Sequence, residues 1–177
     1  MAAAAVLEVD HLTKRFGNHA ALNAVSFSVC EREVVALLGD NGAGKSTLVK
    51  RIAGIYRPDD GDIRLAGERF HAESPSGARA RGVGIVYRVI LDEPTAALGL
   101  RERGNVLRLV RQLPEMGVAV VLISHNLEDV IAVADRAVVL RQGRKVGEVQ
   151  ATEANHETMV SLIVGGQSAS PDGRAVQ

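Results

Sequence analysis

The sequence is poor in the residues on which several common classes of protein depend. It has one cysteine, Cys30, and no tryptophan, and aromatic residues make up only 3% of its 177 residues. One cysteine cannot close an internal disulfide, and without a Cys/His cluster a structural zinc site has no ligands. Few aromatic rings also leave little material for base-stacking platforms. These absences exclude a disulfide-built domain and a zinc finger, and they favour a reducing, cytoplasmic location.

The chain also carries no net charge. Lys and Arg number 21, as do Asp and Glu, so the formal net charge is zero. A balanced surface offers no broad positive field to a phosphate backbone, so nucleic acid is not an expected partner. No run approaches the roughly 18 apolar residues that a membrane-spanning helix needs, and the apolar start, Met1 to Leu7, has no basic region of a signal peptide. We expect no membrane span.

Hydrophobic residues are plentiful, at 46% of the chain. A domain of about 150 residues buries roughly 70% of the surface of its unfolded chain, so this chain is long enough to form one hydrophobic core. The sequence shows no internal repeat and no change of amino-acid composition that would mark a second domain. The segment from Gly165 onward, however, is rich in Gly, Ser, Pro and Asp. We expect one domain over residues 1–164 and a disordered tail over residues 165–177.

Short β-branched runs alternate with helical patterns, which predicts an α/β fold with a largely parallel sheet. The runs Leu7 to Leu12 and Val25 to Val29 predict a small antiparallel β element ahead of it. The other expected strands are Val34 to Leu38, Asp62 to Leu65, Val118 to Ile123, Arg136 to Leu140 and Lys145 to Val149. Helices are expected after Ser46 up to Gly54, and over Arg101 to Leu113, Leu127 to Ala134 and Asn155 to Val164.

The segment Gly39 to Ser46 matches the pattern GxxxxGK[ST] between an expected strand and an expected helix. Gly42 and Gly44 allow backbone N–H groups to turn inward around a phosphate, and the helix that begins near Lys45 adds the positive end of its dipole. Lys45 supplies a charge to the β and γ phosphates, and the Ser46 hydroxyl can bind Mg²⁺. The sequence therefore predicts a site for a nucleoside triphosphate with magnesium.

Two further apolar runs end in polar side chains. One run ends at Asp92 and Glu93, and the other is followed closely by His125. In an α/β sheet ligands bind beyond the carboxyl ends of the strands, where successive side chains diverge. Asp92 can therefore hold magnesium while Glu93 polarises an attacking water. His125 is expected at the same edge.

These motifs together resemble one family. The phosphate loop, Leu91-Asp92-Glu93-Pro94-Thr95, Ile123-Ser124-His125-Asn126 and Ala134-Asp135-Arg136, in that order, are similar to the ATP-binding subunit of an ABC transporter. The sequence from Gly39 to Lys45 resembles that of the branch of the family that serves bacterial importers of simple sugars such as ribose, xylose and fructose. The resemblance implies a P-loop ATPase core, a membrane permease partner and a second ATPase subunit.

The resemblance also implies roles for individual residues. Glu93 matches the catalytic base and His125 the residue that senses the γ-phosphate. Phe16 matches an aromatic residue that stacks on adenine; without the resemblance Phe16 would be read as core. The residues expected to bind ATP are Phe16, Gly39, Asp40, Asn41, Gly42, Ala43, Gly44, Lys45, Ser46 and Thr47, and those expected to bind magnesium are Ser46 and Asp92.

The chain departs from the family pattern at one place. Where the family has a glutamine, then a helical subdomain with an LSGGQ signature, this chain has Arg88 followed at once by the apolar run from Val89. Parallel neighbours need a crossover of about a dozen residues, so we expect one continuous strand over Val83 to Asp92 and an unpaired sheet edge. Hydrolysis and coupling to transport are expected to be impaired.

Alternatives remain open at this point. The chain could be a non-catalytic partner that caps an intact ATPase subunit, or a gene remnant without function. A P-loop small-molecule kinase would need an arginine-bearing lid, whereas Arg79 and Arg81 precede a strand. A serine hydrolase is excluded because the chain has no GxSxG motif.

Overall fold

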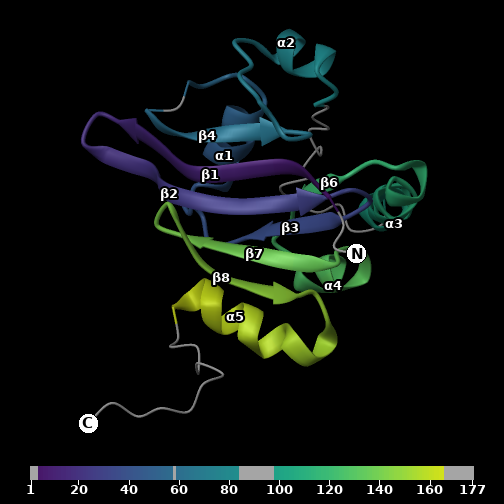
Figure 1. Ribbon diagram of the computed structural model, residues 1–177. Coiled ribbons are helices and arrows are strands. Elements are labelled where there is room, and N and C mark those ends of the chain that lie inside the picture. Colours follow the sequence, from purple (N-terminus) through teal and green to yellow (C-terminus); the bar gives the residue numbers. More distant parts are fainter. Residues whose placement is uncertain (1–3, 58, 84–97, 166–177) are drawn as a thin grey trace.

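The computed structural model describes residues 4–57, 59–83 and 98–165, which form two four-stranded sheets and the helices around them (Figure 1). The strands are β1 (Ala5–Phe16), β2 (His19–Cys30), β3 (Val34–Leu38), β4 (Asp60–Leu65), β5 (Glu68–Arg69), β6 (Val120–Ile123), β7 (Arg136–Arg141) and β8 (Arg144–Gln150). The helices are α1 (Lys45–Ile52), α2 (Pro75–Ala80), α3 (Leu98–Gln112), α4 (Leu127–Val133) and α5 (His156–Val164). Short 3₁₀ turns lie at Pro114–Met116 and Glu153–Asn155.

The main sheet has the strand order β6-β3-β7-β8. β3 pairs in parallel with both β6 and β7, and β8 closes the sheet as an antiparallel hairpin with β7. All five residues of β3 are buried, as expected for a central parallel strand that reads as a continuous apolar run. The predicted α/β fold with a largely parallel sheet is confirmed.

The predicted antiparallel β element is also present, as a second sheet with the order β2-β1-β4-β5. Its first two strands are longer than the sequence indicated, because each continues through an irregularity. The backbone takes positive φ at His11 (47°) and Ala24 (51°), and the β1–β2 register shifts between Val9 and Leu12. Such bulges break the alternation of apolar and polar residues that marks a strand.

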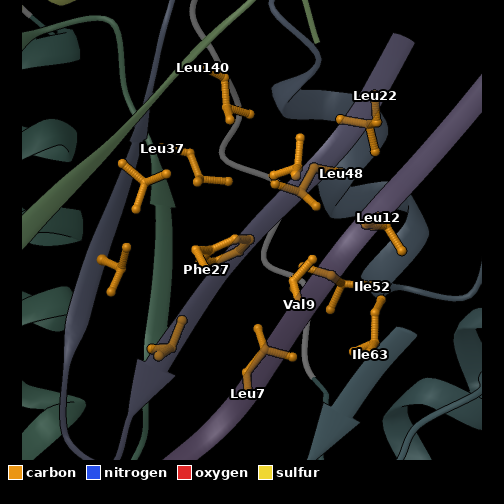
Figure 2. Packing of buried hydrophobic residues seen from close by; sticks show 14 of the residues in the cluster. Leu7, Val9, Leu12, Leu22, Phe27, Leu37, Leu48, Ile52, Ile63 and Leu140 are labelled. Atoms are coloured by element: carbon orange, nitrogen blue, oxygen red, sulfur yellow. The ribbon is translucent and has the colours of Figure 1, made fainter. Parts of the chain in front are cut away.

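The largest apolar cluster lies where the second sheet packs against α1 and the main sheet. Figure 2 shows Leu7 and Val9 of β1 and Phe27 of β2 in the same cluster as Leu37 of β3 and Leu48 of α1. Each fully buried aliphatic side chain contributes about 1.5–3 kcal/mol relative to an exposed one. This cluster holds α1, and with it the phosphate loop, against the end of β3.

A second cluster covers the other face of the main sheet. Leu38 of β3 packs there with Val130 of α4 and with Met159 and Leu162 of α5. Figure 1 shows α5 lying along β7 and β8, on the side away from the second sheet. Because of this packing, the end of α5 reaches the same edge of the sheet as the phosphate loop.

Two elements were not expected from the sequence, β5 and α2. The segment around α2 is rich in Ser, Gly and Pro, which favours a loop. The structure shows that Ser74 caps the helix, since its hydroxyl oxygen accepts a hydrogen bond from the Gly77 amide at 3.1 Å, and that Pro75 opens it. A serine cap followed by proline is a local helix signal.

Two sequence predictions lie outside the described residues. They are the continuous strand over Val83 to Asp92, of which only Val83 is described, and most of the disordered tail over 165–177. The limits of the single domain therefore stay a prediction. Among the described helices none is long and apolar enough to cross a membrane.

Arg51, on α1, is a buried cation in an apolar setting. Its side chain is 1% exposed, and within the described residues its Nε and Nη1 atoms have no hydrogen-bond partner. Burial lowers the pKa of Arg51 because the charged form loses its hydration. No anion among the described residues compensates this charge, and a buried charge without a partner destabilises a fold.

We expect Arg51→Leu to stabilise the protein by about 1–3 kcal/mol, because leucine removes the unpartnered polar group and keeps the position filled. Urea unfolding measures this as a higher midpoint. Arg57→Leu is the matched control, since Arg57 is 73% exposed and pairs with Glu73 at 3.3 Å; its midpoint should stay unchanged. A lower midpoint for Arg51→Leu would contradict the prediction.

Candidate functional site

The phosphate loop connects the end of β3 to the start of α1, and glycine is required in it for steric reasons. Gly39, Gly42 and Gly44 have φ values of 139°, 86° and 103°, which L side chains rarely adopt. A Cβ on Gly44 would also lie 2.6 Å from the carbonyl oxygen of Ala21. The loop is thus pressed against β2 at the point where α1 begins.

This loop presents unpaired backbone donors. Gly44 is the N-cap of α1, and in the part of the chain that the structure describes the amides of Gly42, Gly44 and Lys45 donate to no acceptor. The first N–H groups of a helix have no partner within the helix and carry partial positive charge. Residues 39–45 therefore fit a phosphate group.

Lys45 folds back over the loop that precedes it. Its side chain is 6% exposed, and Nζ donates to the carbonyl oxygens of Gly39 and Asp40, at 2.7 Å each. Burial lowers the pKa of Lys45, while the charge of Asp40 opposes that shift. The ammonium group thus closes the loop, and it lies where a bound phosphate would meet it.

The next two residues differ in exposure. Ser46 is exposed and Thr47 is half-buried, so the Ser46 hydroxyl is open to a ligand. Within the described residues no group of three or more His, Cys, Asp or Glu side chains is arranged to hold a metal ion. Asp92 and Glu93 lie outside the described residues, so magnesium binding by Ser46 and Asp92 remains a prediction.

A surface depression of about 580 Å³ lies beside the loop. Its lining comes from β3, the phosphate loop, the segment after β6 and α5: Leu38, Gly39, Asp40, Asn41, Ser124, His125 and Ile163. Because β3 and β6 are parallel neighbours, with Leu37 opposite Ile123, the residues that follow them meet at one edge. The structure thus places His125 beside the phosphate loop.

His125 is exposed, but its neighbours are anchored. The Ser124 hydroxyl oxygen accepts a hydrogen bond from the Asn126 amide at 3.2 Å. The Asn126 side-chain oxygen accepts one from the Asp129 amide at 3.0 Å and so caps α4. Sequence reasoning missed these two roles, although Asn before a helical pattern is a cap signal. It also missed Ile163, which no local signal marks, because only packing brings α5 to this edge.

Phe16 does not line the depression. It is the last residue of β1 and is 46% exposed, so reading it as core is wrong. A strand end projects beyond the layer that packs on it, which leaves the ring outside the apolar clusters. Arg79 and Arg81 are engaged elsewhere, with the Pro75 carbonyl and with Glu68.

The strand, glycine loop and helix, set in a mainly parallel sheet, define a P-loop nucleotide-binding fold. A solved nucleotide-free ATP-binding cassette from an ABC transporter superposes with a TM-score of 0.75 at 18% identity, covering 91% of this chain and 98% of that one. An ADP-bound cassette gives 0.70, again at 18% identity, with 92% and 99% covered. These likenesses establish the fold.

Sequence comparison identifies the family. A family model described as ABC transporter matches residues 22–159, so the chain belongs to the ABC transporter family. The ribose import ATP-binding protein of Rubrobacter xylanophilus is 32% identical over 235 residues, covering 90% of this chain and 47% of that protein. That of Rhodococcus jostii is 28% identical over 236 residues with the same coverage. The chain spans about half the length of these relatives.

Proposed function

We propose that this chain is the ATP-binding component of a bacterial carbohydrate importer, and that its phosphate loop binds ATP with magnesium. The observation that carries the proposal is the loop over Gly39 to Ser46, with its unpaired amides and Lys45, beside His125 at one depression. The curated relatives support the substrate class, because their names describe ribose import.

Each site residue has a role in this proposal. The amides of residues 39–47 and Lys45 bind the phosphates, and Phe16 stacks on the base. Ser46 and Asp92 would hold Mg²⁺, which would neutralise phosphate charge. Glu93 orients and deprotonates the attacking water. His125 donates a hydrogen bond to the γ-phosphate.

We also propose that hydrolysis by this chain alone is weak, because it lacks the family's glutamine and LSGGQ signature. The length of the alignment supports an omitted segment. The Rubrobacter protein aligns over 235 residues, whereas 90% of 177 residues is about 159, so about 76 positions of that protein have no counterpart here. In this family the signature contacts ATP from a second subunit. By analogy with arginine fingers, such a contact can raise the rate of hydrolysis about 10³–10⁵-fold.

The test is to measure Mg-ATP binding and phosphate release separately. We expect the chain to bind Mg-ATP, to release phosphate near the background rate, and to release it faster when an intact cassette from the same importer supplies the signature. Glu93→Gln should remove that stimulation and leave binding intact. Stimulation that survives Glu93→Gln would mean that this chain is a non-catalytic partner. An absence of ATP binding would contradict the proposal.

A further inference from the structure

Tyr56, four residues beyond the end of α1, packs against Phe16. The two ring centroids are 5.3 Å apart and the rings stand at 76°, an edge-to-face contact. Tyr56 is half-buried, whereas Phe16 is 46% exposed. The turn between α1 and Tyr56 requires glycine at position 54, since the φ of Gly54 is 73° and a Cβ there would lie 2.7 Å from the Cβ of Ala72. The contact thus joins the end of β1 to the segment after α1.

Each ring of the aromatic pair has a lysine close to it. The Nζ atom of Lys14 is 5.5 Å from the Phe16 centroid, and that of Lys50 is 5.9 Å from the Tyr56 centroid. Lys14 is also held by Asp59, with Nζ 3.0 Å from Oδ1. Cations at such distances are attracted to the ring faces. The rings are therefore braced by their surroundings.

The pair is also close enough to the phosphate loop to share one ligand with it. Phe16 is opposite His19 across the β1–β2 turn, and Ala21, two residues along β2, contacts the loop at Gly44. Paired Cα atoms are about 5 Å apart and a strand rises about 3.3 Å per residue. Phe16 therefore lies within roughly 12 Å of Ala21, the residue of β2 that contacts the loop at Gly44, and a nucleoside triphosphate is long enough to reach from this region to the loop.

We infer that Tyr56 is a positioning residue for base recognition: it holds the exposed Phe16 ring in one orientation, so that a purine base can stack on it. This inference rests on the proposed function. Without Tyr56, Phe16 at its strand end is free to change rotamer, and base binding then has to order it. Stacking uses the π face that every base has, so Tyr56 strengthens binding of the base and does not affect binding of the phosphates.

The experiment compares ATP with inorganic tripolyphosphate by calorimetric titration. We expect Tyr56→Ala to weaken ATP binding about 2- to 12-fold, the worth of one aromatic pair, and to leave tripolyphosphate binding unchanged. Tyr56→Phe should bind ATP as the wild type does, because the ring remains. Ile55→Ala is the matched control, since Ile55 is the exposed neighbour and belongs to no ring contact; it should bind both ligands normally.

Fluorescence gives a second readout. The chain has no tryptophan and two tyrosines, so in Tyr87→Phe the emission comes from Tyr56. ATP should change that emission and tripolyphosphate should not.

Three results overturn the inference. In the first, Tyr56→Ala binds ATP with wild-type affinity while Phe16→Ala binds it more weakly. In the second, Tyr56→Ala loses the same amount of affinity for ATP and for tripolyphosphate. In the third, the Tyr56 emission does not change when ATP binds. If the wild-type protein binds tripolyphosphate and ATP equally well, and Phe16→Ala has no effect, the base-stacking part of the proposed function fails instead. If the wild type binds neither ligand, the nucleotide site itself is refuted.

Discussion

Lys45→Ala is expected to abolish ATP binding at concentrations at which the wild-type protein is saturated. Among the described residues, the Lys45 Nζ atom is the side-chain cation that contacts the loop, through the Gly39 and Asp40 carbonyl oxygens. A hydrogen bond to a charged group contributes about 1.5–3 kcal/mol, so losing the upper value weakens binding about 100-fold. Isothermal titration with Mg-ATP measures the difference, and an ATP-induced shift in melting temperature provides a second readout.

The matched control for Lys45→Ala is Lys145→Ala, which removes a lysine of β8 that pairs with Glu148. That variant should bind ATP normally. Lys45→Ala should also fold, because a buried ammonium with a lowered pKa costs the protein stability that alanine does not. A Lys45→Ala protein that melts cooperatively and binds ATP with wild-type affinity would refute the phosphate-binding role of the loop.

Arg136→Met is expected to destabilise the protein by about 3–5 kcal/mol, since removing one member of a buried ion-pair network leaves the others uncompensated. Arg136 on β7 donates to Glu33 at 2.6 Å, to Glu148 at 2.6 Å and to the Ser28 carbonyl. Its side chain is 11% exposed. The network ties β2 of one sheet to β7 and β8 of the other, so its loss should weaken the contact between the two sheets.

The measurement is urea unfolding at neutral pH, with Arg69→Met as the control. Arg69 makes an ion pair with Asp62 at 2.7 Å, but its side chain is 76% exposed, and exposed pairs contribute about 0–1 kcal/mol. Only Arg136→Met should therefore move the midpoint strongly. Similar shifts in the two variants would show that burial does not set the strength of the Arg136 network.

The same network predicts an acid dependence. Burial raises the pKa of Glu33, but hydrogen bonds from Arg136 and the Cys30 amide outweigh it, so the pKa lies below its ordinary value of 4.5. Burial opposes the shift of Glu148 too, and Lys145 and Arg136 lower its pKa overall. Groups with a lowered pKa stabilise the fold above their ordinary pKa and lose this contribution as the pH falls. The stability difference between wild type and Arg136→Met should therefore shrink as the pH is lowered below about 4.5.

The phosphate loop could be predicted from the sequence because its requirements are local. Glycine at positions 39, 42 and 44 is required by the backbone conformation of those residues, and the apolar run Val34 to Leu38 identifies the strand before them. The antiparallel element was predicted with strands that were too short, because the bulges at His11 and Ala24 interrupt the alternation. The helix α2 was not among the expected helices, although Ser74 before Pro75 is a local cap signal.

Residues brought together by packing could not be predicted in this way. Ile163 reaches the depression only because α5 packs along β7 and β8. Tyr56 meets Phe16 only because Gly54 turns the chain after α1. Arg51 lies on a short helix between Lys50 and Ile52, and nothing in that local pattern distinguishes a buried arginine from a solvated one.

By itself the sequence determined the strand–loop–helix unit that can hold a phosphate, and the motifs by which the chain resembles its family. Both depend on steric limits and residue types within a few neighbouring positions. Only the tertiary structure decided that β6 lies beside β3, which places His125 at the loop. It also decided that Phe16, the last residue of β1, packs against Tyr56. The physical reason is that strand order and helix docking are selected by burial of apolar surface between segments far apart in the chain, which local residue patterns do not encode.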